Sequence, residues 1–312
     1  MIVADALCFI ARHGRAALVL GLIAGFALPG LAGAMKPALP AMVAGLVFIS
    51  ALRIGLRAAV GNLKDARESL GLVLILQLLL PLLMTTALWL TGWHGTAAAL
   101  ALVLATSGAS ISGAPAFTVM VGHDPAPAMR LLILGTALLP LTILPVFWLT
   151  PALGGLDEVA VAALRLTLVI AVAVAVAFTL RRMLFPDPKP ETIQMLDGLS
   201  ALSLAVIVVG LMSAVGPTLR SDPAELLGWL ALACGVNFGM QALSLAVHHA
   251  TDHPNPVGTS IIAGNRNIAL FLVALPAATT DQVLIFIGCY QVPMYLTPVL
   301  MRRIYAREAI RV

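Results

Sequence analysis

Apolar residues fill long runs of the chain, and short polar segments separate each run from the next. Each run is about 20 residues long, which is the length that an α-helix needs to cross a bilayer. The pattern predicts ten membrane-spanning helices: residues 16–34, 37–55, 70–92, 97–121, 126–149, 159–180, 197–219, 224–248, 257–277 and 282–301. We expect the residues before the first span to form a short amphipathic helix or the start of that span, not a cleaved signal.

The composition supports an all-α polytopic membrane protein. Of the 312 residues, 61% are hydrophobic and 10% are charged, whereas a soluble domain carries about 25% charged residues. Most of the surface is therefore expected to face the lipid bilayer. The net charge of +4 is too small and too dispersed to indicate a nucleic-acid partner. The three cysteines lie far apart and lack the spacing of metal ligands.

The basic residues are distributed unevenly over the two sides of the membrane. An excess of Lys and Arg marks cytoplasmic connections, so the distribution predicts that both termini are cytoplasmic in a bacterial-type inner membrane. The opposite side receives only Lys36 and Arg220, with Arg165 a turn or two into a span. The cytoplasmic set comprises Arg12, Arg15, Arg53, Arg57, Lys64, Arg67, Arg181, Arg182, Lys189, Arg302, Arg303, Arg307 and Arg311.

A charged linker, "FPDPKPETIQM", follows the fifth span and divides the chain into two halves, residues 1–156 and 157–312. Because five is odd, two five-span repeats would have opposite orientations, which is the inverted-repeat plan of many secondary transporters. The fourth and ninth spans are counterparts in this scheme, and polar or helix-breaking residues interrupt both, in "ATSGASISGAPAFTVMVG" and "SIIAGNRNIALF". We expect the two broken helices to cross and to form a binding site near the membrane midplane.

Arg266 lies in the middle of the ninth span, where a charged side chain costs at least about 2.5–3.5 kcal/mol. All the carboxylates of the chain fall in connections or near span ends, so none is placed to pair with Arg266 deep in the membrane. Backbone carbonyls of the broken fourth span are one possible partner, and they would give Arg266 a structural role. A visiting anion is the other, and we favour this second interpretation.

Few other polar residues lie inside the spans. Gln77 and Gln291 are expected to face the site, whereas Asn237 and Gln241 are expected mainly to join helices through hydrogen bonds. Arg130 lies close to a span end, so a site role and extension to the cytoplasmic surface are equally compatible with its position. The sequence contains no catalytic constellation, phosphate loop or metal-ligand spacing, and we expect neither enzymatic activity nor a cofactor.

The motifs "LQLLLPLL", "SGASISGAPAFTVMVG", "TSIIAGNRNIAL" and "LLILGTALLPLTILPV" resemble the bile acid/sodium symporter family, and the similarity is diffuse over nearly the whole chain. The resemblance implies ten spans, inverted five-span repeats and a core-plus-panel arrangement in one membrane domain. Gln77 matches the family's glutamine in the third span. The family's sodium-binding glutamate and glutamine in the ninth span fall on Ile262 and Arg266, and its next asparagine falls on Asn267. The fourth-span serine and asparagine, also tied to sodium, fall on Ala114 and Pro115.

These departures predict that the sodium ligands are lost at Ala114, Pro115 and Ile262, and that the charge of Arg266 replaces a sodium ion. We therefore expect a sodium-independent secondary transporter of a small organic anion, a carboxylate, working by alternating access as a uniporter or exchanger. The expected substrate-binding residues are Arg266, Asn265, Asn267, Gln77, Ser110, Ser112, Gln291 and Arg130. Alternatives are an auxin-efflux-type or other ten-span carrier, and a non-transporting membrane receptor or scaffold in which Arg266 is structural.

Overall fold

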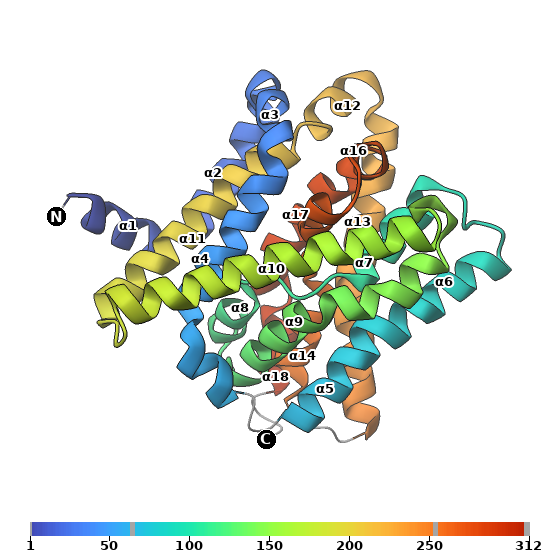
Figure 1. Ribbon diagram of the computed structural model, residues 1–312. Helices are drawn as coiled ribbons and strands as arrows, with labels where there is room; N and C mark the ends of the chain where they lie inside the picture. The colour runs from blue at the N-terminus through green and yellow to red at the C-terminus, as the bar shows by residue number, and fades with distance from the viewer. Residues whose placement is uncertain (1, 63–65, 252–254, 309–312) are drawn as a thin grey trace.

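The computed structural model describes residues 2–62, 66–251 and 255–308, so Lys64 and Arg311 lie outside the described residues. Within these ranges the protein is helical, and extended pairing is limited to a single isolated bridge between Ser110 and Arg266. Figure 1 shows long helices inclined to one another, with short helices between them. The described part of the chain is thus all-α, as the apolar runs predicted.

The helices of the first half are α1 (Ile2–Arg12), α2 (Gly14–Ala27), α3 (Pro29–Met35), η1 (Lys36–Ala38), α4 (Leu39–Asn62), α5 (Ala66–Leu74), η2 (Ile75–Leu79), α6 (Leu80–Leu90), α7 (Ala97–Ser107), α8 (Ala114–Met120), α9 (Ala126–Trp148) and η3 (Pro151–Leu153). Those of the second half are α10 (Leu156–Leu184), α11 (Pro190–Leu211), α12 (Val215–Ser221), α13 (Pro223–Thr251), α14 (Pro256–Gly264), η4 (Ile268–Leu270), α15 (Phe271–Ala274), α16 (Ala277–Asp281), α17 (Leu284–Leu300) and α18 (Arg302–Glu308).

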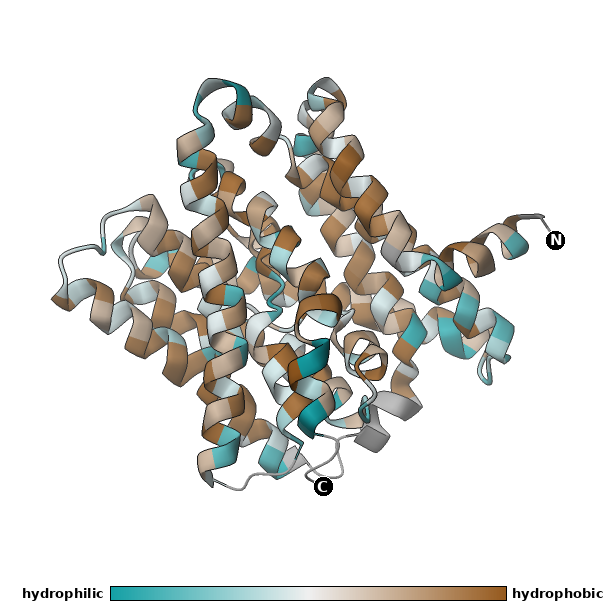
Figure 2. Ribbon diagram, turned by 180° about the vertical axis from the view of Figure 1, so that it is seen from behind, coloured by the Kyte–Doolittle hydropathy of each residue, from teal (hydrophilic) through white to brown (hydrophobic). Residues whose placement is uncertain are grey.

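Many of these helices are suited to a bilayer. Among the described residues, six helical segments are long and apolar enough to cross a membrane, and the number rises to eight if each of two bent pairs is one span. On α10, Leu164, Leu168 and Val172 are all more than half exposed and lie on one face of the helix. Figure 2 shows apolar residues along most helices, with hydrophilic residues concentrated towards the connections. The protein is a multi-pass membrane protein; the count of ten spans stays a prediction.

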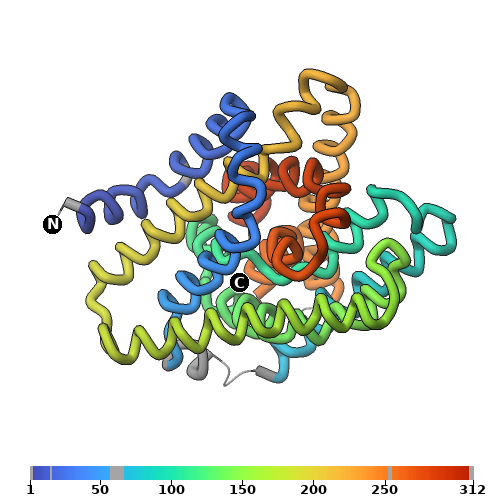
Figure 3. Tube along the Cα trace, turned by 45° about the horizontal axis from the view of Figure 1, so that its top comes forward, coloured from blue at the N-terminus to red at the C-terminus, as the bar shows by residue number. Residues whose placement is uncertain are grey.

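The helices pack in two groups. In the first, α4 contacts both α10 and α11, and α11 in turn contacts α1 and α2. In the second, α13 contacts α14 and α17, while α9 contacts α5, α8 and α14. Figures 1 and 3 show α2, α4 and α11 running side by side. The two groups touch, since α11 also contacts α17. The groups also meet where α10 and α4 each contact α9 and α15.

Two helical segments are interrupted where glycines and polar residues break the apolar pattern. The first break separates α7 from α8, and the second separates α14 from η4. The two connecting segments run antiparallel: the Ile111 amide donates to the Asn265 carbonyl at 3.1 Å, and the Asn267 amide donates to the Ala109 carbonyl at 2.7 Å. The two broken segments thus cross and are joined by backbone hydrogen bonds.

Candidate functional site

Arg266 lies at this crossing with a side chain that is completely enclosed, since the residue is only 1% exposed. Its guanidinium donates three hydrogen bonds to backbone carbonyls. Nε donates to Ala263 O at 2.9 Å, Nη1 to Gly108 O at 3.0 Å and Nη2 to Leu76 O at 3.0 Å. The guanidinium therefore ties together the third, fourth and ninth of the expected spans.

Each of the three carbonyls can accept from Arg266 because no backbone N–H of its own helix donates to it. In η2, a π-helical turn, the Leu80 amide donates to Ile75 O. The next amide in this register would reach Leu76 O, but residue 81 is a proline and has no N–H. A local feature of the third span, readable in "LQLLLPLL", thus supplies one of the acceptors of Arg266.

The other two acceptors lie at helix ends. Gly108 follows the last residue of α7, so its carbonyl lies beyond the regular hydrogen bonds of that helix. Ala263 lies in the last turn of α14, and the amide four residues later, that of Asn267, donates to Ala109 O instead. The C-terminal end of a helix carries a partial negative charge equivalent to about −0.5. The ends of α7 and α14 therefore stabilise a cation at the position of Arg266.

The surroundings of Arg266 explain how its charge is tolerated. No described carboxylate forms an ion pair with it. Its observed partners are backbone carbonyls, which is the arrangement expected if Arg266 has a structural role. A guanidinium has five N–H groups, so two are without an acceptor in the described part of the chain. Arg266 also lines a small cavity, of about 30 Å³, together with Ser112, Asn267 and Gln291. A small polar group is the most that this cavity admits.

A buried polar network holds the other side of the ninth span. The Gly264 carbonyl accepts hydrogen bonds from Tyr290 Oη and Asn237 Nδ2, both at 2.5 Å. Gln241 Nε2 donates to Asn237 Oδ1 at 2.7 Å and to Thr297 Oγ1 at 3.1 Å. Asn237 and Gln241 therefore join α13 to the break and to α17, as their positions in the sequence indicated.

The predicted site residues separate into distinct places. Ser112, Asn267 and Gln291 lie with Arg266 around the small cavity. The Asn265 side chain points instead into the buried network, donating to Ile261 O at 2.7 Å and accepting from Thr297 Oγ1 at 3.1 Å.

The remaining predicted residues line neither this cavity nor the larger cleft described below. Ser110 is buried and donates to the Ile111 carbonyl at 3.2 Å. Gln77 is buried beside Gly135, and its Oε1 has no hydrogen-bond partner among the described residues. Arg130 is half-buried near the start of α9. Ala114, Pro115 and Ile262 are buried and present no side-chain oxygen. The structure therefore does not bring all the predicted residues to one surface.

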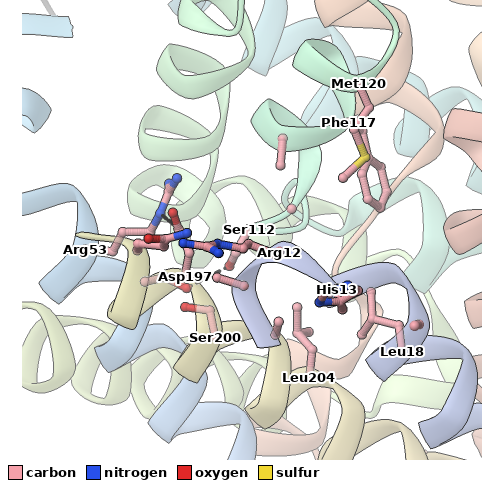
Figure 4. A pocket seen from close by; sticks show the side chains of 18 of the residues that line it. Arg12, His13, Leu18, Arg53, Ser112, Phe117, Met120, Asp197, Ser200 and Leu204 are labelled. Carbon is pink, nitrogen blue, oxygen red and sulfur yellow. Dashed lines mark hydrogen bonds and ion pairs between the residues drawn. The ribbon is translucent and has the colours of Figure 1, made fainter. Parts of the chain in front are cut away.

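A larger cleft, of about 700 Å³, lies between the two groups of helices. Arg12, Arg53, Asp197 and Ser112 provide charged and polar groups, and Figure 4 places Arg53, Asp197 and Ser112 close together. The apolar lining includes Leu18, Ile54, Phe117, Met120, Leu132 and Leu204. The cleft is thus amphipathic, and Ser112 and Leu204 line both it and the small cavity beside Arg266.

Polar contacts connect the walls of the cleft. Arg53 Nε on α4 donates to Asp197 Oδ1 on α11, and Ser50 Oγ on α4 donates to Ser112 Oγ in the first break at 2.9 Å. The latter bond links the two groups of helices directly. From the sequence, Arg53 and Asp197 were only charges near span ends, so the cleft was not expected. The one signal in the sequence was that Arg53 and Asp197 both lie near the predicted cytoplasmic ends of their spans.

The chain matches none of the protein-family models and none of the curated proteins with which it was compared. The resemblance to the bile acid/sodium symporter family therefore stays a prediction that rests on the motifs of the sequence.

Proposed function

We propose that the protein is a secondary transporter of a small organic anion, a carboxylate, and that it works by alternating access. The observation that carries this proposal is the pairing of two broken helical segments beside a cleft between two groups of helices. Irregular backbone at membrane depth is tolerated where it is buried in protein or lines a cavity, and paired broken helices are typical of transporter binding sites.

In this proposal the chain has ten spans in two inverted repeats, residues 1–156 and 157–312, with both termini in the cytoplasm of a bacterial-type inner membrane. The resemblance to the bile acid/sodium symporter family supports this arrangement. The crossing lies at corresponding places of the two proposed repeats, since it pairs Ser110 with Arg266. The cleft opens between the groups, and movement of one group against the other exposes it to each side in turn.

Arg266 serves as a permanent cation in place of a bound sodium ion. Its three carbonyl acceptors come from three separate segments, which is the kind of oxygen environment that a cation requires. Ile262, Ala114 and Pro115 provide no side-chain oxygen at the positions where the family binds sodium. The proposed transport is therefore independent of sodium and proceeds as uniport or exchange.

The substrate path leads from the large cleft towards the crossing. Ser112 stands at the junction because it lines both cavities, and Asn267 and Gln291 lie beyond it next to Arg266. Arg266 supplies positive potential to this path through its unoccupied N–H groups, while the carbonyls hold its position. An anion entering the cleft thus approaches a site of fixed positive charge.

A second function is favoured by one observation: the carbonyl contacts of Arg266 are complete enough to act as a structural lock. A receptor or scaffold needs such a lock but needs no substrate movement. Uptake of a carboxylate panel into proteoliposomes, with and without sodium, separates the two functions. We expect uptake that does not depend on sodium. Strict sodium dependence contradicts the fixed-cation proposal, and a chain that binds carboxylates but moves none is a receptor.

A further inference from the structure

Arg53 presents an unused hydrogen-bonding edge to the large cleft. Its Nε donates to Asp197 Oδ1, and neither terminal nitrogen, Nη1 or Nη2, has a partner among the described residues. The side chain of Arg53 is 31% exposed and lines the cleft, as Figure 4 shows. The two terminal nitrogens of a guanidinium form a planar fork that matches the two oxygens of a carboxylate.

The backbone that carries Arg53 is held in place from a neighbouring helix. Arg181 Nη1 on α10 donates to both Leu52 O and Arg53 O. These carbonyls lie just before Gly55, where α4 is kinked and φ is 72°. The kink interrupts the regular helical hydrogen bonds, so the two carbonyls can accept from Arg181. Because Arg181 fixes the backbone and Asp197 fixes Nε, the fork of Arg53 is oriented before any ligand arrives.

The chemistry of the cleft selects a ligand with one anionic end and an apolar body. The charged residues that line the cleft are two arginines, Arg12 and Arg53, and one carboxylate, Asp197. His13 also lines the cleft. His13 directs Nδ1 to the Phe9 carbonyl of its own segment at 3.0 Å. Apolar side chains line the rest of the cleft, and about 700 Å³ is sufficient for a small organic molecule.

We propose that Arg53 is the anion-recognition residue of this cleft and binds the carboxylate of an amphipathic monoanion through Nη1 and Nη2. Asp197 is a positioning residue: its oxygen orients Arg53, and its charge weakens anion binding at the same time. This inference rests on the proposed function for the identity of the site as a substrate site. It assigns recognition to Arg53 and leaves Arg266 to hold the crossing.

The test uses binding of 3-phenylpropionate to the purified full chain in detergent, measured by calorimetry, with 3-phenylpropionamide as the uncharged probe. Arg53→Lys retains the charge but removes the fork, so it lowers carboxylate affinity more than tenfold and leaves amide binding unchanged. Arg182→Ala is the matched control, because Arg182 is exposed and does not line the cleft. Arg53→Ala is the second variant, and size-exclusion elution verifies that each variant is folded.

The role of Asp197 is tested with two variants that remove the same charge. Asp197→Asn keeps an oxygen that accepts from Arg53 Nε, so carboxylate affinity rises several-fold over the wild type. Asp197→Ala removes that oxygen, so affinity falls below that of Asp197→Asn. A purely electrostatic role predicts equal affinities for the two variants and overturns the positioning assignment.

Three outcomes overturn the recognition assignment: a wild-type chain that does not bind the carboxylate, folded Arg53 variants that bind it normally, and an Arg182→Ala variant that loses it equally. Failure of the inference is distinguishable from failure of the proposed function. If the wild type transports carboxylates but binding does not depend on Arg53, only the inference fails. If binding depends on Arg53 but no substrate crosses the membrane, the inference stands and the transporter proposal fails.

Discussion

Removing the side chain of Arg266 provides the most direct test of the crossing. The substitution Arg266→Ala leaves the carbonyls of Leu76, Gly108 and Ala263 without their donor. Each unsatisfied buried carbonyl costs about 1–3 kcal/mol, and relief of the arginine's own burial in the membrane offsets about 2.5–3.5 kcal/mol. At the middle of these ranges the net loss in free energy of unfolding is about 3 kcal/mol.

The assay is thermal unfolding of the purified chain in detergent, with and without added guanidinium ion. Free guanidinium fits the space vacated in Arg266→Ala and again donates to the three carbonyls, so it raises the unfolding midpoint of this variant. Arg266→Gln has one amide with two N–H groups and reaches fewer carbonyls, so its stability lies between those of the alanine variant and the wild type.

The control is Arg182→Ala, which removes an exposed arginine and changes stability by less than about 0.5 kcal/mol. Two results refute the reasoning. One is an Arg266→Ala variant as stable as this control. The other is guanidinium that shifts the wild type and Arg266→Ala equally, because rescue then does not involve the vacated site.

Two further substitutions test the backbone around the crossing by thermal unfolding. Pro81→Ala restores an N–H that competes with Arg266 for Leu76 O. Replacing a helical proline by alanine gains about 3 kcal/mol and weakening the hydrogen bond from the guanidinium costs about 1.5–3 kcal/mol, so we expect a net gain below about 1.5 kcal/mol; a gain of the full amount, about 3 kcal/mol, contradicts the assignment. Gly264→Ala places a Cβ about 2.2 Å from Asn237 O, so we expect a loss of more than about 3 kcal/mol. Its control, Gly228→Ala, meets nothing within 4 Å inside α13 and is expected to be neutral or stabilising; equal losses in the two variants argue against the close approach.

The sequence was informative about the crossing because local residue types determine where a helix breaks. Glycines, serines and Pro115 in the fourth span, and Gly264 with its polar neighbours in the ninth, predicted both interruptions. The expectation that the two breaks lie together came from the proposed inverted repeats, in which the fourth and ninth spans are counterparts. The lone charge of Arg266 also identified the crossing as a place that needs compensation.

The partners of that charge were less accessible to prediction. Leu76 is 190 positions away from Arg266 in the chain. Every residue has a backbone carbonyl, so the residue types do not show which carbonyl will accept from Arg266. Pro81 did not enter the prediction, although its missing N–H is a local signal of a free acceptor nearby. The cleft was missed for a related reason, because Arg53 and Asp197 become neighbours only when α4 packs against α11. The position of Arg130 was compatible with either a site role or extension to the cytoplasmic surface, and Arg130 does not line the cavity that Arg266 lines.

A cation that belongs to the polypeptide has an electrical consequence for the proposed transport. Sodium bound by a symporter crosses with the substrate and compensates its charge, whereas the guanidinium of Arg266 stays with the chain and is never released. A monoanion carried alone therefore moves net charge, and a membrane potential of 100 mV contributes about 2.3 kcal/mol per charge. With the cytoplasm negative, that energy drives a carboxylate outward. Exchange of one monoanion for another moves no net charge, so the voltage dependence of flux distinguishes a uniporter from an exchanger.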